Sequence, residues 1–485
     1  MRLRSMCALL LFAGIHLAYP GYAAPQARRE LGPTEAAQRT LLRNVKLFNV
    51  ATGEMTLPRD LLIEGDTISA ILPAHSEEKA TRQIECRGKY AIPGLFDSHT
   101  HLAQLTRQGE DSLKKALFYF AHYGVLHVRD AGGPIDVIRE MSRKTASGEW
   151  QGPEIYYTGP MLESSPLTWA KFNEDLPGFT VAIDTEADVD SLLPALAAKG
   201  AHIIKTFNHI DPALYRHVVE VAHRCSLEIV HDPGTPLFHR VPMDLALDLG
   251  VTSIEHAKAP WPVVLKDELR AKQDAATGPG ANPMSQMAVM SAVVEAGLGG
   301  IDSLRLRDLS AKMVAHDAYL CPTLHVFIEM AETAKEKADS MGDADSTSAA
   351  DSTDSDDSPV AAKKMPPEVR ALMLKVMGAM EEVSRYFVRE MSAAGVKMLV
   401  GQDGIDPQAT LAEMRHMQDC GVPRAEILRG ATIYPARWLK VDDRLGSIEP
   451  GKLADLVVVS ENPLTDIANM EKVLFVMQRG VLLAD

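Results

Sequence analysis

Residues 91–102 read AIPGLFDSHTHL, an apolar run that ends in a His-x-His pair. Side chains alternate along an extended strand, so His99 and His101 face the same side. Two neutral imidazoles side by side at a strand end can bind one divalent cation. Because an isolated His-x-His is short and more often structural, a metal site requires further ligands from elsewhere in the chain.

The segment after this pair alternates short apolar runs with helical stretches, the pattern of a parallel α/β fold. Eight strands alternating with helices predict a (β/α)8 TIM-type barrel over residues 93–439, with its active site at the carboxyl ends of the strands. The first expected strand ends at residues 97–99, and the others cover 125–130, 154–158, 201–207, 227–231, 253–256, 319–324 and 397–403.

Both ends of the mature chain are rich in β pattern. Residues 40–92 contain three alternating segments separated by glycine-containing turns, and residues 440–485 contain the apolar segments ADLVVVS and VLFVMQR. Two β-rich ends around a different middle predict one small β-sandwich domain assembled from both termini.

The first 24 residues resemble a secretory signal peptide. Two arginines precede an apolar run over residues 6–17, and Gly-Tyr-Ala follows as a small-x-small cleavage site. That run is too short to span a bilayer, so we expect an exported, periplasmic or secreted protein without a membrane anchor after cleavage. The net charge of −15 argues against nucleic acid as a partner.

A second segment of unusual composition covers residues 338–364. It is rich in Ser, Asp, Thr and Ala and almost free of large apolar side chains, so it cannot bury enough surface to fold alone. We expect a disordered acidic insertion there. Its aspartates lack the spacing of a calcium-binding loop.

Residue types that bind metals stand at the ends of several expected strands, where a barrel would gather them around one mouth. Any one of them has a structural explanation, such as an ion pair of the lysine or a carbonyl contact of a histidine. Their shared position at strand ends favours a common site. The residues are His99, His101, Lys205, His231, His256 and Asp403.

With these positions go the motifs PGLFDSHTHL, GVLHVRDAGG, IIKTF, EIVHD, SIEHA, CPTL, VGQDG and GSIEPGKLADLVVV. In this order they resemble the amidohydrolase superfamily, in particular the branch of imidazolonepropionases and metal-dependent Xaa-Pro dipeptidase-like enzymes. The resemblance implies two divalent metal ions. The first-strand histidines and Asp403 would bind one, His231 and His256 the other, and a carbamate on Lys205 would bridge them.

The same resemblance implies the chemistry. Zn²⁺ fits the histidine and carboxylate ligands best. Water activated as hydroxide by the metals would attack an amide carbonyl, and Asp403 would act as general base and then general acid. The expected small-molecule substrate is a dipeptide or an N-acyl amino acid, and a homo-oligomer is compatible with the family. Side chains just beyond the strand ends are candidates for substrate binding: Tyr157, Asn208, His209, Asp232, His325 and Gln402.

Two alternatives stay open. Without a carbamate on Lys205, the protein would be a single-metal cyclic-amide hydrolase or deaminase. It would otherwise be a noncatalytic metal-binding protein on the same barrel, although such a protein would not need Asp403 as a proton shuttle. A serine hydrolase and a dinucleotide enzyme are disfavoured, since the sequence lacks G-x-S-x-G and G-x-G-x-x-G.

Overall fold

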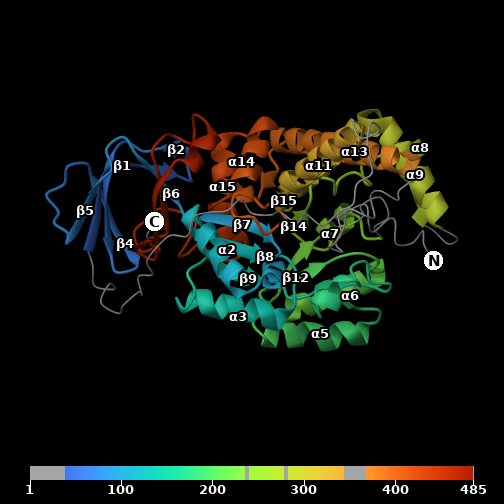
Figure 1. Cartoon of the computed structure of the whole chain (residues 1–485), viewed down its shortest axis with the longest axis horizontal. Coiled ribbons are helices and arrows are strands. Elements are labelled where there is room, and N and C mark those ends of the chain that lie inside the picture. Colours follow the sequence, from blue (N-terminus) through green and yellow to red (C-terminus); the bar gives the residue numbers. More distant parts are fainter. Residues whose placement is uncertain (1–38, 235–239, 278–281, 343–366, 484–485) are drawn as a thin grey trace, which may run out of the picture.

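The computed structural model of the chain describes residues 39–234, 240–277, 282–342 and 367–483. The predicted signal peptide and residues 343–364 of the predicted acidic insertion lie outside the described residues. A nine-stranded sheet lies at one end of the molecule, and a larger α/β body lies beside it (Figure 1).

The α/β body is built on parallel strands in two sheets. The smaller sheet has the order β7 (Leu95–Thr100), β8 (Val125–Asp130), β9 (Glu154–Tyr157). The larger has the order β11 (Thr180–Ala182), β10 (Met161–Glu163), β12 (Ile203–Thr206), β13 (Glu228–His231), β14 (Ser253–Glu255), β15 (Tyr319–Cys321), β16 (Lys397–Met398).

Backbone hydrogen bonds join the two sheets between β7 and the segment that follows β16. The amide of Ser98 donates to the carbonyl of Val400 at 2.7 Å, and the amide of Asp403 donates to the carbonyl of His99 at 2.8 Å. A Cβ at Gly401 would lie 2.8 Å from the His99 nitrogen, so only glycine permits this close approach. The first and last expected strands of the body are therefore neighbours.

Two strands of the larger sheet, β10 and β11, fall outside the eight segments expected from the sequence. Both run parallel to their partners, with Met161 opposite Thr180 on one side and Lys205 on the other. Each is only three residues long, too short for an alternating pattern to identify. They place the loop between them next to β12, which carries Lys205.

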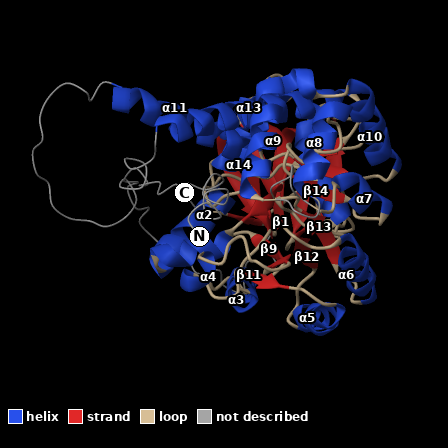
Figure 2. Cartoon of the chain, turned by 90° about the vertical axis from the view of Figure 1, so that its right-hand side faces the viewer, coloured by secondary structure: helices blue, strands red, loops and turns tan. Residues whose placement is uncertain are grey.

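Helices surround the parallel strands (Figure 2). Several carry apolar faces that pack on the strands, as α6 does with its buried Leu214, Val218 and Ala222. The main helices are α2 (Glu110–His122), α3 (Ile135–Ala146), α5 (Glu186–Ala198), α6 (Pro212–Arg224), α8 (Asp267–Thr277), α9 (Pro283–Ala296), α10 (Ser303–Ala315), α11 (Leu324–Gly342), α13 (Pro367–Ala393), α14 (Ala409–Asp419) and α15 (Arg424–Gly430).

The nine-stranded sheet draws strands from both ends of the described chain (Figure 1). Its centre is the antiparallel pairing of β6 with β17, in which Ile92 lies opposite Val457. Strands β2 (Glu54–Met55) and β5 (Arg82–Glu85) pair with β1 beside the main path. That path runs β19 (Val481–Leu482), β18 (Val473–Gln478), β17 (Leu456–Val459), β6 (Tyr90–Pro93), β1 (Arg39–Asn49), β3 (Arg59–Glu64), β4 (Thr67–Pro73).

The boundary predicted for the acidic insertion is wrong at its amino-terminal side. Helix α11 continues through Gly342, so residues 338–342 are helical. Alanine and methionine continue here after a run of good helix formers, which favours extension of the helix.

Among the described residues, no helix combines the length and apolar character needed to cross a bilayer.

Candidate metal centre

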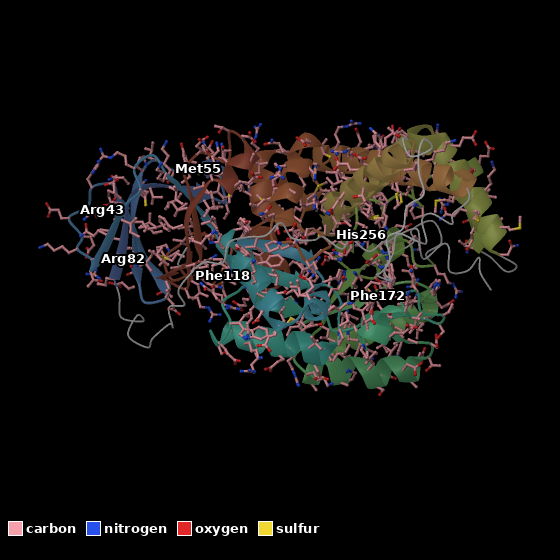
Figure 3. The ribbon with its side chains drawn as sticks, in the orientation of Figure 1. Arg43, Met55, Arg82, Phe118, Phe172 and His256 are labelled. Atoms are coloured by element: carbon pink, nitrogen blue, oxygen red, sulfur yellow. The ribbon has the colours of Figure 1, made fainter. Side chains whose placement is uncertain are left out.

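The ends of β7, β12, β13 and β14 and the segment after β16 hold the ionisable side chains of the site. His256 and Asp403 have positive φ values of 69° and 58°, so the chain leaves the extended conformation where these side chains project. His99, Lys205 and His231 are at most 1% exposed, whereas His101, His256 and Asp403 are 5–8% exposed. Figure 3 places His256 within the α/β body, apart from Arg43 and Arg82 on the nine-stranded sheet.

His99 is held by a buried chain of charged groups. Its Nδ1 lies 2.6 Å from Glu255, and the other carboxylate oxygen of Glu255 accepts from Arg129 at 2.7 Å and from Ser253 at 2.9 Å. Burial would raise the pKa of Glu255, but Arg129 and His99 lower it to about 2. Since an ionised carboxylate only accepts, the proton of His99 sits on Nδ1 and its Nε2 presents a lone pair.

That Nε2 points at the other candidate ligands. Burial and the charge of Lys205 lower the pKa of His99 to about 4, so the ring is neutral near pH 7, as metal binding requires. The Nε2 of His99 lies 3.3 Å from Oδ1 of Asp403, and the Nε2 of His101 lies 3.2 Å from the same oxygen. The Nδ1 of His101 lies 3.1 Å from the carbonyl of Gly132.

Asp403 is ionised in this setting. Burial would raise its pKa, but the imidazoles of His99, His101 and His256 hold the pKa below the usual range. The Nδ1 of His256 lies 3.8 Å from Oδ2 of Asp403. Donor atoms of His99, His256 and Asp403 all lie within 4.8 Å of one another. The donor atoms of these three residues can therefore contribute to one metal centre.

Lys205 lies at the same centre and is paired with an aspartate. Its Nζ lies 2.9 Å from Oδ2 of Asp232 and 3.2 Å from Nε2 of His99. Oδ2 of Asp232 also accepts from Nε2 of His256 at 3.0 Å. Burial would raise the pKa of Asp232, but the neighbouring His256 and Lys205 hold it well below its usual value.

His231 ends the strand next to Lys205, where Thr206 is its register partner. Its Nδ1 lies 3.0 Å from the hydroxyl of Tyr215, and the two rings meet edge to face. Tyr215 on α6 therefore fixes the orientation of this imidazole, as a partner of a metal-binding histidine commonly does.

A cavity of about 50 Å³ opens over these groups. It reaches Lys205, Asp232, His256 and Asp403, and its walls are largely aromatic and aliphatic. Phe179 lies against His101 with ring centroids 5.9 Å apart and stacks on Phe172 at 5.1 Å. The other lining residues are His101, Gln104, Met161, Trp169, Phe207, Gly234, Lys258, Val326, Phe327 and Met330.

Of the side chains proposed to bind substrate, Asp232 lines this cavity, whereas Tyr157, His209, His325 and Gln402 are not among the described residues that line it. The hydroxyl of Tyr157 donates to the carbonyl of Lys199 at 3.2 Å. His209 is exposed, and His325 stacks on His416. Gln402 is buried, and its backbone amide donates to Asp97 at 3.4 Å.

Several residues of the site were not anticipated from the sequence. Glu255 directly precedes His256, and Arg129 lies in the VLHVRD strand. Both are charged residues inside otherwise apolar strand segments, and such burial requires a partner. That pattern is the available signal for the Arg129–Glu255–His99 chain.

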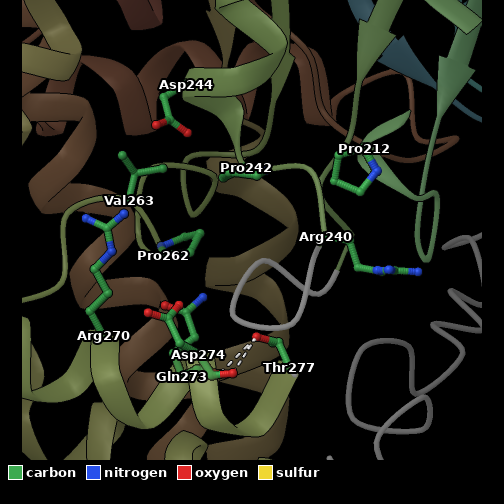
Figure 4. Close-up of a pocket in the computed structure, with 10 residues that line it drawn as sticks. All are labelled: Pro212, Arg240, Pro242, Asp244, Pro262, Val263, Arg270, Gln273, Asp274 and Thr277. Carbon is green, nitrogen blue, oxygen red and sulfur yellow. Dashed lines mark hydrogen bonds between the residues drawn. The ribbon is translucent and has the colours of Figure 1, made fainter. Parts of the chain in front are cut away.

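A larger cavity of about 290 Å³ lies apart from these ligands (Figure 4). Pro212, Pro242 and Pro262 form part of its wall, together with Arg240 and Arg270. No residue predicted to bind metal or substrate lines it, as far as the described residues extend. The smaller cavity is the one that reaches the candidate ligands.

Comparisons with known proteins show what this fold and part of the sequence resemble. A model of the amidohydrolase family matches residues 292–483. The fold is similar to that of a Xaa-Pro dipeptidase solved with methionine in its active site, with a TM-score of 0.64 and 21% identity over 92% of this chain and 100% of that one. Residues 292–483 are thus similar to the amidohydrolase family, and the solved structure shares the fold.

Curated relatives match over shorter stretches. An N-acetylglucosamine-6-phosphate deacetylase of Haemophilus influenzae is 51% identical over 41 residues, which are 8% of this chain and 11% of that protein. A dihydroorotase of Streptomyces coelicolor is 23% identical over 244 residues, 48% of this chain and 50% of the relative. Because the chain spans at most half the length of these two relatives, the likeness assigns no substrate.

Proposed function

We propose that this protein is an exported amidohydrolase that cleaves an amide bond of a dipeptide or an N-acyl amino acid with the help of two divalent metal ions, Zn²⁺ by preference. The observation that carries the proposal is the convergence of His99, His256 and Asp403 donor atoms within 4.8 Å in a buried site. A set of imidazole and carboxylate donors suits Zn²⁺.

The residues present fit such a centre. His99, His101 and Asp403 would hold one ion, and His231 and His256 the other. Lys205 would bridge them as a carbamate, because a lysine ammonium cannot bind a cation whereas a carbamate offers two anionic oxygens. Bound divalent cations supply Lewis acidity, which polarises a carbonyl and acidifies water.

The protein side chains then handle protons and orientation. Asp403 is ionised, and its Oδ1 lies 3.3 Å from His99 and 3.2 Å from His101. It would accept the proton of the attacking water and return it to the leaving amine nitrogen. Glu255 holds His99 in the tautomer that leaves Nε2 free for ligation. The aromatic walls exclude bulk water from the reacting bond.

A second candidate is a single-metal cyclic-amide hydrolase or deaminase. In that protein Lys205 would remain an ammonium and keep Asp232, 2.9 Å away, as its counter-charge. Metal content separates the two proposals. Protein purified without chelator and supplemented with Zn²⁺ should contain about two ions per chain, as the binuclear ligand set implies. A value near one would favour the alternative, and a value near zero would overturn both.

The substrate class is tested with the metal-loaded protein against a panel. Ala-Phe, Met-Pro and N-acetyl-L-phenylalanine represent the proposal, whereas dihydroorotate and adenine represent the alternative. Product release from the first group should disappear in His101→Ala and persist in a control, His217→Ala, whose imidazole pairs with Asp190 on the surface. Turnover of dihydroorotate or adenine alone would contradict the proposal.

The finer architecture and the location belong to the same proposal. The two parallel sheets would form one (β/α)8 barrel over residues 93–439, and residues 40–92 with 440–485 a β-sandwich domain. The backbone hydrogen bonds between β7 and the segment after β16 support closure of the barrel. Cleavage of residues 1–24 would release the protein to the periplasm or medium, and amino-terminal sequencing of the exported protein should begin after residue 24. A homo-oligomer is part of the proposal and is tested by its mass in solution.

A further inference from the structure

The cavity over the candidate metal centre holds a second lysine besides Lys205. Lys258 follows β14, lines the cavity and is only 4% exposed. Its Nζ lies 4.9 Å from the ring centroid of Phe327.

The two lysines differ in their partners. Lys205 has a carboxylate at 2.9 Å, whereas no described residue makes a hydrogen bond or an ion pair with Nζ of Lys258. Burying an ammonium group without an acceptor is unfavourable. The aspartates nearest in the lining, Asp232 and Asp403, are already engaged with Lys205 and the histidines. An anion entering the cavity would complete the environment of Lys258.

The cavity has two chemically different sides. The side near His101 carries an aromatic cluster of Trp169, Phe172 and Phe179. The ring centroids of Trp169 and Phe172 lie 5.4 Å apart, and those of Phe172 and Phe179 lie 5.1 Å apart. On the side of His256, Phe327 lies 5.8 Å from the imidazole and beneath the ammonium of Lys258. The candidate ligands lie between these sides.

From this arrangement we propose that Lys258 binds a free carboxylate of the substrate, while the aromatic cluster binds an apolar group on the other side of the scissile bond. This inference rests on the proposed amide hydrolysis and narrows it to anionic substrates, such as dipeptides or N-acyl amino acids with an unblocked carboxyl group. Neutral amides and nucleobases lack the group that Lys258 would recognise.

The binding of a carboxylate in this cavity is tested by measuring ligand affinity separately from turnover. The Zn²⁺-loaded full-length protein is titrated calorimetrically with 3-phenylpropanoate and with 3-phenylpropanol, which have no amide bond to cleave and differ in the carboxylate. The wild type should bind the carboxylate about 10–100-fold more tightly, the range expected for a charged contact in a desolvated site. Equal affinities would overturn the inference without any variant being needed.

Variants assign the preference to one side chain. Lys258→Met keeps an apolar stem of similar length and should abolish the preference, whereas Lys258→Arg should retain part of it. The control Lys171→Met removes an exposed charge next to Phe172 in the chain and should keep the wild-type ratio. A preference that persists in Lys258→Met would show that the metal ions alone bind the carboxylate, and would overturn the assignment.

Hydrolysis then separates this inference from the proposed function. Carboxylate preference in binding together with no hydrolysis of Ala-Phe would refute the amidohydrolase proposal and uphold Lys258 as an anion-binding residue. Equal kcat/KM for Ala-Phe and its carboxamide, with release of phenylalanine or its amide, would uphold the proposed function and refute the role of Lys258.

Discussion

Replacing Glu255 with glutamine tests how the protein prepares His99 for metal binding. The carboxylate accepts from Nδ1 of His99 at 2.6 Å and from Arg129 at 2.7 Å, and it is fully buried. A glutamine amide has nearly the same shape but can donate to Nδ1. Donation would move the ring proton to Nε2 and remove the lone pair that the metal needs.

The expected cost follows from this geometry. Loss of the partner of a metal-binding histidine typically lowers metal affinity by about 10–100-fold, or about 1.4–2.7 kcal/mol. The variant should also be less stable in chelator by about 3 kcal/mol, since Arg129 is only 2% exposed and loses its counter-charge. Competition with a chromophoric chelator measures the first effect, and urea unfolding in EDTA measures the second.

A matched control separates the effect on the tautomer of His99 from the general effect of replacing a buried glutamate. Glu413 is also buried, but its carboxylate accepts from the backbone amides of Leu324 and His325. Burial raises its pKa to about 8, so Glu413→Gln replaces a group that is mostly neutral at pH 7. Its Zn²⁺ affinity should stay within about twofold of wild type, since no candidate ligand loses its partner. An unchanged Zn²⁺ affinity in Glu255→Gln would refute the reasoning.

Three further substitutions test other parts of the account. Asp403→Asn should lower turnover by about 10²–10⁴ while much of the metal is retained, and near-normal kcat would exclude Asp403 as the proton carrier. Lys205→Ala should be inactive but partly rescued by short-chain carboxylic acids, and absence of rescue would favour a single-metal site. Asp60→Asn should destabilise the nine-stranded sheet by about 2–3 kcal/mol at pH 7, because the carboxylate accepts from the amides of Asn44 and Ser76 at 2.9 Å. Burial opposes ionisation of Asp60, but these hydrogen bonds lower its pKa. The contribution of Asp60 to folding stability is therefore fully present above the unfolded pKa of about 3.9, and it is lost as the pH falls through the lower pKa of the folded state. Urea midpoints of wild type and variant should therefore converge in acid, and a constant difference down to pH 2 would contradict this assignment.

The strand ends of the body were accessible to sequence reasoning because parallel strands combine short apolar runs with polar residues at their carboxyl ends. This logic brought His99, His101, Lys205, His256 and Asp403 together before any coordinates. It depended only on local pattern and on the rule that such ends meet at one edge of the fold.

The substrate cavity was not accessible in the same way. Position beyond a strand end does not fix direction, and Tyr157 turns outward to the carbonyl of Lys199. Trp169 and Phe172 come from the segment between β10 and β11, whose helix α4 (Phe172–Asp175) is too short to show a period in the sequence. Lys258 lies in a turn after β14, where its burial depends on Phe327 from a distant helix. Such contacts are set by tertiary packing.

The most direct test of the central claim is an anomalous-scattering map at the zinc edge from crystals of the Zn²⁺-loaded protein. The account predicts two peaks, one about 2.0–2.2 Å from ligand atoms of His99, His101 and Asp403 and the other at the same distance from His231 and His256, with carbamate density on Lys205. A site without anomalous signal, or with one peak and Lys205 still paired with Asp232, would contradict it.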